Sequence, residues 1–435
     1  MNHLLRFPLL LALSFICATT FAQTTNHMLV GYWHNWNDMN APYIPLSQVD
    51  DRYDVIALSF AIPASASDMT MQFMPDGTTP AALQSEIAAL KAQGKKVVIS
   101  VGGATASVSL DTEDQKNDFV QSMNDIISQY GFNGMDIDIE YGSTILAAGG
   151  TISNPTSASQ LNLIDAVKEI MEHYHMQNGE KLFLTFAPET AYVQGGQSGF
   201  GGIWGGYLPL LDALRDSIDI LQVQLYNSGT MFGIDGVVYE QGNADFIVAM
   251  TEAVIQGFQT AGGFFEGFPA EKVAVGLPAC ELAAGGGYVE PTEVIQAMHY
   301  LLGNGPQPGS YALLETNAYP DLKGMMTWSI NWDAVQSCAG DHSFAETYDE
   351  VFGLVTHVEE RNTSSWLLYP NPVRNHVFVE GFAGDAPMKV LITDMSGRVV
   401  LQHTLQIGQP LDVGQLSGGT YLLNAEGQTR LFVKE

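Results

Sequence analysis

The stretch NGMDIDIE, residues 133–140, places a carboxylate at every second position, with isoleucines between the acids. In a β-strand, residues two apart point to the same face, so Asp136, Asp138 and Glu140 share one face at about 6–7 Å per step. The intervening isoleucines point the other way, toward an apolar layer. The pattern therefore predicts a buried strand that sets three acids side by side in an interior.

Three acids in an interior are costly unless they share protons or accept hydrogen bonds. Because neighbouring like charges cannot all ionise easily, we expect at least one raised pKa, which suits a general acid at neutral pH. An acidic edge strand is disfavoured because its alternate residues would not be apolar. A calcium or magnesium site is disfavoured because an evenly stepped strand does not wrap an ion. We predict catalytic acids here, with no metal and no other cofactor.

Seven further apolar, β-branched runs accompany this one, each closed by a loop. Near-continuous apolar runs are typical of parallel strands that are covered on both faces. Polar and aromatic residues gather where these runs end, and aromatic faces suit the C–H surfaces of pyranose rings, which predicts a sugar cleft. The predicted strands lie at 28–33, 54–60, 95–103, 132–140, 181–189, 218–227, 272–279 and 323–333.

Amphipathic helical patterns alternate with these runs, and one begins with a capping box formed by Thr112 and Gln115. Eight strands with interleaved helices predict an α/β fold, a closed (β/α)8 TIM barrel, whose chemistry sits at the carboxyl ends of the strands. The alternative, a doubly wound open sheet, lacks a glycine-rich dinucleotide fingerprint after its first strand. The predicted helices lie at 80–93, 112–130, 158–177, 246–258, 291–302 and 343–353.

The chain has 17 Lys and Arg against 47 Asp and Glu, a formal net charge of −30 at pH 7. This charge repels polyanions, so neither nucleic acid nor an anionic membrane surface is an expected partner. It permits a neutral ligand and favours solubility. With 46% apolar residues the chain can bury a large core, which excludes a disordered acidic chain.

The two ends of the chain differ from its central block. In residues 1–22, Arg6 precedes an apolar run too short for a permanent anchor, which is typical of a secretory signal peptide. The barrel is expected at 23–360, followed by a polar linker at 361–365. Residues 366–435 change to a period of two with turns between the runs, which predicts a small all-β C-terminal domain.

Cys280 and Cys338 are the cysteines that remain once the predicted signal peptide is removed. Export makes a disulfide possible, but two thiols in a long chain are no disulfide framework. Both are equally suited to be core residues, so the sequence leaves their pairing open. No group of cysteine and histidine residues has zinc spacing.

Four motifs, in the same order, resemble those of glycoside hydrolase family 18, the chitinases and endo-β-N-acetylglucosaminidases. NGMDIDIE resembles the family signature D-G-x-D-x-D-x-E, with Asn133 in place of the first Asp, which touches no catalytic position. The stretch 192–214 looks like the small bacterial and plant-type branch. The other motifs are ISVGG at 99–103, VQLYN at 223–227 and MTWSINWD at 326–333.

The resemblance implies hydrolysis of a β-1,4 bond after N-acetylglucosamine, with retention, through attack by the sugar's own acetamido oxygen. Glu140 would protonate the leaving oxygen and later deprotonate water. Asp138 would orient the acetamido N–H, and Asp136 would share a proton with Asp138. Tyr226 would donate its hydroxyl to the acetamido oxygen. The implied substrate-binding residues are Gln224, Asn227, Trp328, Tyr32 and Phe60, whereas Trp33, Trp36 and Trp204 match no motif.

The resemblance predicts a secreted chitinase that acts on chitin or chitooligosaccharides. Some chitinases insert an α+β subdomain between the last two strands, and the short segment from Cys280 to Lys323 leaves no room for it, so a shallow cleft and endo attack are expected. An endo-β-N-acetylglucosaminidase acting on N-glycans is the alternative enzyme. A chitin-binding lectin is the alternative from another class, and such lectins typically lack the acid that Glu140 supplies.

The C-terminal block resembles the sorting domain of type IX secretion in Gram-negative bacteria. The resemblance rests on LYPNPVRNHVFVE at 368–380, DMSGRVV at 394–400 and LSGGTYLL at 416–423. A carbohydrate-binding module is the rival interpretation, disfavoured because the block has few aromatic candidates beyond Trp366 and Tyr369. We expect a monomer that engages the type IX machinery and reaches the exterior or the cell surface after periplasmic passage.

Overall fold

The computed structural model describes residues 27–140, 142–353, 367–369, 371–380, 388–395, 397–406, 409–425 and 428–435. The chain divides into two compact units between Gly353 and Leu354. The predicted signal peptide and the predicted linker at 361–365 lie outside the described residues.

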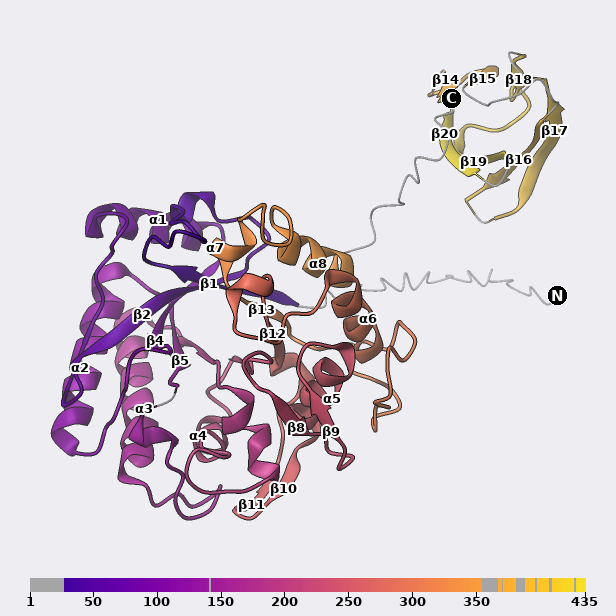
Figure 1. The fold of residues 1–435 in the computed structure, drawn as a ribbon. Coiled ribbons are helices and arrows are strands. Elements are labelled where there is room, and N and C mark those ends of the chain that lie inside the picture. Colours follow the sequence, from indigo (N-terminus) through magenta and orange to yellow (C-terminus); the bar gives the residue numbers. More distant parts are fainter. Residues whose placement is uncertain are drawn as a thin grey trace, which may run out of the picture. The chain divides into compact units, whose positions relative to one another are not determined.

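The first unit is built around eight parallel strands (Figure 1). Their bounds are β1 (Met28–His34), β2 (Val55–Ser65), β4 (Lys96–Gly102), β5 (Gly134–Asp138), β6 (Phe183–Phe186), β7 (Ile220–Leu221), β12 (Ala274–Pro278) and β13 (Gly324–Trp328). They pair in the order β12, β13, β1, β2, β4, β5, β6, β7. Parallel bridges from Leu221 to Val273 and from Gln224 to Gly276 join the two ends of this order. The predicted α/β TIM barrel is confirmed, although its sixth strand is shorter than expected.

The predicted helices are present on the outside of the barrel (Figure 1). In α2 the predicted capping box forms, with the Thr112 side chain accepting from the Gln115 backbone N–H. Two further helices, α4 (Leu208–Leu214) and α7 (Ile330–Asp333), are too short for a periodic pattern to reveal them. The longer helices are α1 (Pro80–Ala92), α2 (Glu113–Tyr130), α3 (Ala158–Asn178), α5 (Ala244–Gln256), α6 (Pro291–Leu301) and α8 (Ser343–Phe352).

Smaller elements border the carboxyl ends of the strands. The strand β3 (Asp68–Gln72) pairs antiparallel with the extended end of β2. Between β12 and β13 the chain forms only the 3₁₀ helix η6 (Glu281–Ala283) and α6, so no extra subdomain stands there. Two hairpins, β8 (Thr230–Phe232) with β9 (Val238–Glu240) and β10 (Phe258–Thr260) with β11 (Gly263–Phe265), complete this unit.

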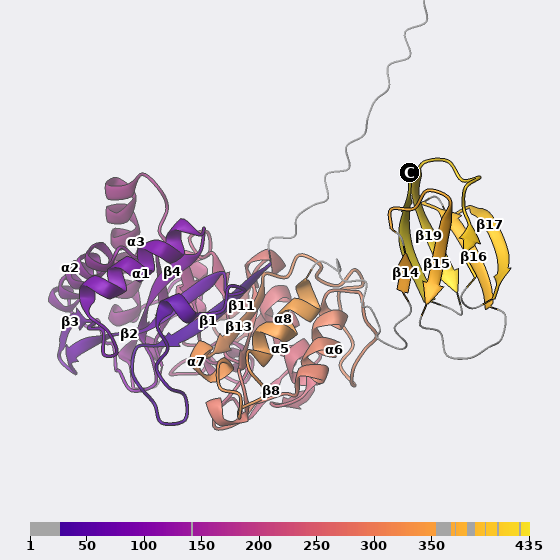
Figure 2. The ribbon, with the colours of Figure 1, turned by 90° about the horizontal axis from the view of Figure 1, so that it is seen from above.

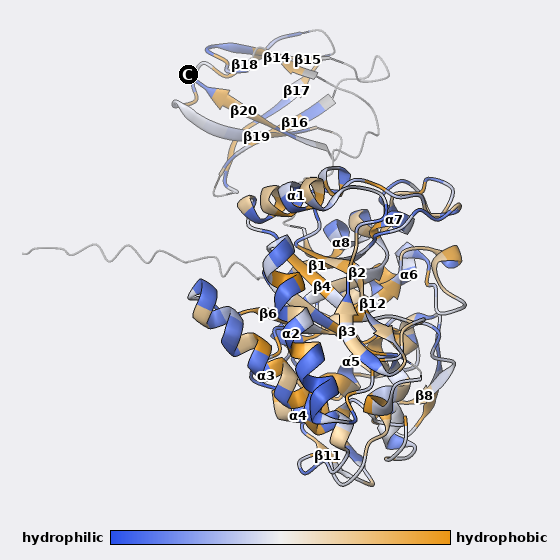
Figure 3. Cartoon of the chain, turned by 90° about the vertical axis from the view of Figure 1, so that its left-hand side faces the viewer, coloured by the Kyte–Doolittle hydropathy of each residue, from blue (hydrophilic) through white to orange (hydrophobic). Residues whose placement is uncertain are grey.

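The main core lies between the strands and the surrounding helices, where the buried side chains of Trp33, Phe119 and Phe186 pack. Figure 3 shows the hydrophobic colour along β1 and β2 and mixed colours on α2 and α3, as expected for buried strands and half-buried helices. Inside the barrel a smaller apolar cluster surrounds Tyr32. No helix in the described residues is long and apolar enough to cross a membrane.

A disulfide joins Cys280, at the end of β12, to Cys338, beyond α7, with 5.5 Å between the Cα atoms. This separation is ordinary for a disulfide. The pairing that the sequence left open is therefore present, and it ties together the chain on both sides of β13.

The second unit consists of antiparallel strands that form a small all-β domain (Figure 2), as predicted. Its core contains the buried side chains of Val377, Ile392, Leu423 and Phe432. One sheet contains β14 (Leu367–Tyr369), β15 (His376–Glu380) and β18 (Leu411–Asp412), and the other contains β16 (Met388–Asp394), β17 (Val399–Leu405), β19 (Gly419–Ala425) and β20 (Gln428–Lys434).

Candidate active site

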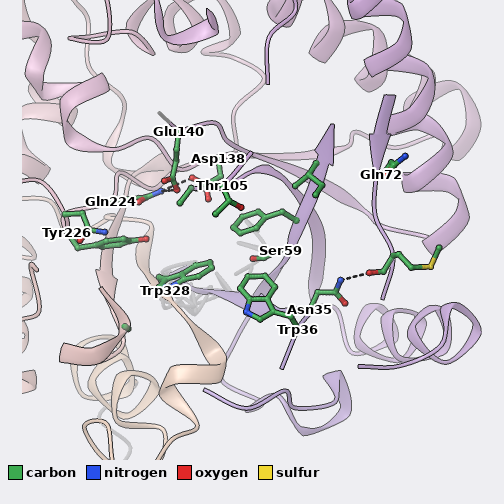
Figure 4. Close-up of a pocket in the computed structure, with 16 residues that line it drawn as sticks. Asn35, Trp36, Ser59, Gln72, Thr105, Asp138, Glu140, Gln224, Tyr226 and Trp328 are labelled. Atoms are coloured by element: carbon green, nitrogen blue, oxygen red, sulfur yellow. Dashed lines mark hydrogen bonds between the residues drawn. The ribbon is translucent and has the colours of Figure 1, made fainter. Parts of the chain in front are cut away.

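The three predicted acids lie on β5 and just after it, and Asp138 and Glu140 line a cavity at the carboxyl ends of the strands (Figure 4). Asp136 is completely buried, Asp138 is nearly so, and Glu140 is partly exposed. Glycine is required on the neighbouring strand, because a Cβ at Gly102 would collide with the carbonyl oxygen of Asp138. The alternating pattern has thus placed a row of carboxylates inside the barrel.

Asp136, the deepest acid, is surrounded by hydrogen-bond donors. The hydroxyls of Tyr32, Ser100 and Thr185 donate to its carboxylate at 2.7, 2.6 and 2.6 Å, and the Gln222 amide donates at 3.4 Å. Burial raises the pKa of Asp136, and the hydrogen bonds lower it in part. These donors make a buried negative charge tolerable at this position.

Asp138 has fewer donors and more neighbouring charge. Gln224 Nε2 donates to Asp138 Oδ1 at 2.8 Å and also lies 3.4 Å from Glu140 Oε1. Burial raises the pKa of Asp138 well above its usual range, and the charges of Glu140 and Asp136 raise it further. Burial and the neighbouring carboxylates thus favour the protonated form of Asp138 more than they would for an exposed aspartate.

Glu140 is the acid nearest to solvent. Burial and then the charge of Glu189 raise its pKa to about 7, while contacts with Gln224 and Asp138 lower it. A carboxyl group with this pKa can both give and take a proton at neutral pH. Glu189 itself accepts from the Tyr192 hydroxyl at 3.1 Å.

Glu189 was not predicted as a site residue, although it ends the predicted strand at 181–189. Its position at the carboxyl end of a predicted barrel strand could have identified it, because functional residues lie at that end of the barrel. A bridge pairs Glu189 with Gln224, so the two residues lie side by side on neighbouring strands. The row of three acids is in fact a group of four.

Tyr226 and Asn227 line the cavity beyond Gln224. Burial raises the pKa of Tyr226 well above its usual range, and the charge of Asp138 raises it further, so its hydroxyl stays a donor. Asn227 Oδ1 accepts from the backbone N–H of Gly285 at 2.9 Å, which ties that side chain to the loop after β12.

Trp328 lies across the cavity from the acids (Figure 4). Phe60 also lines the cavity, and together the two form an aromatic floor, with their rings nearly parallel and 5.9 Å apart. Tyr32 was predicted to bind substrate as well. Its ring lies 5.7 Å from Trp328, but its side chain is only 1% exposed and is not part of the cavity lining. Tyr32 is therefore positioned to support Asp136, to which its hydroxyl donates, and does not line the cavity.

Trp36 lines the cavity, although it matches no family motif. Its ring lies 6.4 Å from Trp328 and 6.3 Å from Phe60. One feature of the sequence could have identified Trp36 as a site residue. It lies two residues beyond the end of β1, at the carboxyl end of the barrel strands, where aromatic residues were expected. Trp33 is buried in the outer core and Trp204 lies at the surface, away from the cavity lining.

The cavity has a volume of about 720 Å³, which is large enough for more than one sugar ring. Beyond Trp36 it extends to Ile62, Gln72 and Met74 on the extended β2 and its partner β3. Within the residues that the structure describes, no group of His, Cys, Asp and Glu is arranged to hold a metal ion. The arrangement is suited to acid–base chemistry on a ligand with flat apolar faces.

The family model described as Glycosyl hydrolases family 18 matches residues 28–338. Together with the barrel and the acids on β5, this match shows that the chain belongs to glycoside hydrolase family 18. A second family model, the Secretion system C-terminal sorting domain, matches residues 367–435, the all-β unit.

Individual relatives agree with this assignment. The chain is 46% identical over 315 residues to Chitinase Chi52 of Paenibacillus xylanexedens, which covers 72% of this chain and 59% of that protein. It is 47% identical over 311 residues to Chitinase D of Niallia circulans, covering 70% and 58%. The chain thus spans somewhat more than half the length of these two relatives. The crystal structure of a family GH18 chitinase from Chromobacterium violaceum matches with 36% identity, a TM-score of 0.67 and coverage of 76% and 84%.

Proposed function

We propose that the chain is a secreted, endo-acting chitinase that hydrolyses β-1,4-linked N-acetylglucosamine polymers with retention. The observation that carries the proposal is the row of acids with raised pKa values opposite the floor of Trp328 and Phe60. The names of relatives such as Chitinase Chi52 and Chitinase D support the same substrate.

In the proposed first step, Glu140 gives its proton to the glycosidic oxygen while the acetamido oxygen of the same sugar attacks C1. The bond between C1 and the leaving oxygen breaks, and an oxazolinium ion forms. Asp138, beside Glu140, accepts a hydrogen bond from the acetamido N–H and stabilises the positive charge. The Tyr226 hydroxyl, which stays protonated, donates to the acetamido oxygen and holds it near C1.

In the proposed second step, Glu140 takes a proton from water, whose oxygen attacks C1 and opens the oxazolinium ring. The acid is restored, and the product keeps the configuration of the substrate because C1 has been inverted twice. A pKa of about 7 suits both halves of this cycle, since Glu140 must first be protonated and then ionised.

Endo attack is supported by the short connection between β12 and β13, which contains η6 and α6 but no extra subdomain beside the cleft. The match of residues 367–435 to a sorting domain supports export through the type IX machinery and a place outside the cell or on its surface. We further propose that the enzyme acts as a monomer and that chitin or chitooligosaccharides are its ligands.

The deciding experiment is product analysis of the purified protein on chitooligosaccharides beside a high-mannose glycoprotein. Cleavage of the oligosaccharides, with the β-anomer formed first in a proton NMR time course, supports the proposal. Release of N-glycans alone assigns an endo-β-N-acetylglucosaminidase, and binding without cleavage assigns a lectin. The product ratio on crystalline chitin tests endo attack, because processive threading yields mainly dimers.

A further inference from the structure

His34 is a buried side chain that the proposed mechanism does not use. It is the last residue of β1, only 3% exposed, and it does not line the cavity. It contacts two indoles that do, those of Trp36 and Trp328. A polar ring placed behind the cavity wall requires an explanation, because burying it without full hydrogen bonding is costly.

The imidazole stacks on the indole of Trp36 and packs at an angle against that of Trp328. Its ring is almost parallel to that of Trp36, at 6° with 4.7 Å between centroids. It is tilted by 40° to the ring of Trp328 at 4.8 Å. The two indole rings are 6.4 Å apart and inclined by 36° to each other. Because the flat imidazole contacts both rings, its position and orientation set the angle between them.

Hydrogen bonds fix the imidazole to the strand that carries Trp328. His34 Nε2 lies 2.7 Å from the hydroxyl of Ser329, the residue after Trp328. The backbone N–H of His34 donates to Asn331 Oδ1 at 2.7 Å. The ring is therefore held by Ser329, between β13 and α7, while the backbone at His34 is held by Asn331 of α7.

Among the described residues His34 Nδ1 has no hydrogen-bond partner, and burial lowers the pKa of the ring to about 4, against an opposing effect of Asp38. The ring is thus neutral over the range in which the acids of the site work. It has no contact with Asp136, Asp138 or Glu140, so a part in proton transfer has no geometric basis.

We propose that His34 is a positioning residue that sets the orientation of Trp36 against Trp328, so that the two indoles form successive platforms for a sugar chain. The sugar in this statement rests on the proposed function, whereas the orientation of the rings does not. Because His34 does not touch the reacting atoms, it should affect the binding of chains long enough to reach Trp36 more than the breaking of the bond.

The test uses the full chain with three substitutions. His34→Gln keeps a group that can bind the Ser329 hydroxyl but removes the ring, and Ser329→Ala keeps the ring but removes the bond. His27→Gln is the matched control, because His27 precedes the same strand at the other end of the barrel and also packs against an aromatic ring, that of Phe352, at 4.4 Å between centroids. The measurements are kcat and KM on chitooligosaccharides of increasing length and near-UV circular dichroism of the unliganded proteins.

For H34Q we expect KM on the longest oligosaccharides to rise about three- to tenfold, the range that one aromatic contact supports, with kcat within about twofold. The tryptophan bands in the near-UV spectrum should weaken. S329A should give a smaller change in the same direction, and H27Q should match the wild type in both measurements.

Wild-type KM values and spectrum in H34Q would overturn the proposal, as would an equal fall in activity on substrates of every length. If H34Q does not fold, His34→Phe replaces it. This variant keeps a flat ring and should retain the spectrum and the low KM, and loss of both would also overturn the proposal. If the wild type cleaves no chitooligosaccharide, the proposed function fails, and the near-UV spectra still decide whether His34 orients the indoles.

Discussion

The barrel contains two kinds of buried acid, and they differ in what faces them. Glu252 on α5 is completely buried and accepts from the hydroxyls of Tyr311 and Tyr319, each at 2.7 Å, and from the backbone N–H groups of Leu314 and Glu315. Asp138 is equally deep but faces other carboxylates and accepts one bond, from Gln224. Glu252 holds the loop at Leu314 and Glu315 in place through these bonds. Asp138 lies in an environment that disfavours its ionised form, which is typical of catalytic acids.

Asp333 on α7 belongs with Glu252. It accepts from the Tyr53 hydroxyl and the Phe344 backbone N–H, both at 2.7 Å, and from Ala345 at 3.3 Å. Burial raises its pKa, and the hydrogen bonds from Tyr53 and Phe344 lower it. The comparison teaches that a buried acid whose neighbours are all donors indicates structure. A buried acid that faces other acids indicates function, and this holds for Asp136 despite its donors, because its charge acts on Asp138.

The largest effect is expected for Glu140→Gln. Loss of the general acid should reduce kcat on chitooligosaccharides about 10²- to 10⁴-fold. Because the pKa of Glu140 rises to about 7 on folding, the native state loses stability as pH rises from the unfolded value of 4.5 through 7. Glutamine does not ionise, so E140Q does not lose stability over this pH range. Its Tm should therefore exceed that of the wild type at pH 8 and equal it at pH 4. Full hydrolysis by E140Q would refute the assigned role.

Glu252→Ala should show the opposite behaviour to Glu140→Gln, a loss of stability with little change in activity. The substitution leaves two buried tyrosine hydroxyls and two backbone N–H groups without their acceptor, which should lower the free energy of unfolding by about 3 kcal/mol or more. Denaturant unfolding measures this loss. Activity per folded molecule should stay within about twofold of the wild type at 25 °C, and a selective loss of activity would mean that the two kinds of acid are not separate.

Two smaller substitutions, one beside each kind of buried acid, test the difference between the catalytic and the structural acids. Tyr32 and Tyr53 each donate a 2.7 Å bond to one acid, Asp136 and Asp333 respectively. Tyr53→Phe should cost about 1 kcal/mol in urea unfolding and leave the pH profile unchanged. Tyr32→Phe removes a bond that lowers the pKa of Asp136, so the acidic limb of kcat/KM should move to higher pH. Equal pH profiles in the two variants would contradict the distinction between the catalytic acid Asp136 and the structural acid Asp333.

The sequence predicted the barrel and its acids because both follow from local periodicity. Continuous apolar runs and the alternation of Asp136, Asp138 and Glu140 are visible without any knowledge of distant contacts. Trp36 and His34 were missed because their roles depend on meeting Trp328, almost three hundred residues away in the chain. The pairing of the two cysteines was open for the same reason.

The distinction between the two kinds of acid was also beyond the sequence. Glu252 and Asp333 lie in helical segments, and nothing local to them shows that distant tyrosines donate to them. Tyr32 was placed among the sugar ligands by the family resemblance, which does not give the depth of a side chain within the barrel. Depth is decided by packing from all strands together, which only the folded structure contains.

The smallest effect is expected for Glu189→Gln, which tests the fourth acid. After burial, the charge of Glu189 is the next cause that raises the pKa of Glu140. Removing that charge should lower the pKa, so Glu140 ionises earlier and the basic limb of kcat/KM moves to lower pH. Glu180→Gln is the control, because it removes the same charge just before the opposite end of β6, beside Tyr174. A basic limb that stays in place in E189Q, or moves equally in E180Q, would show that Glu189 does not act on Glu140.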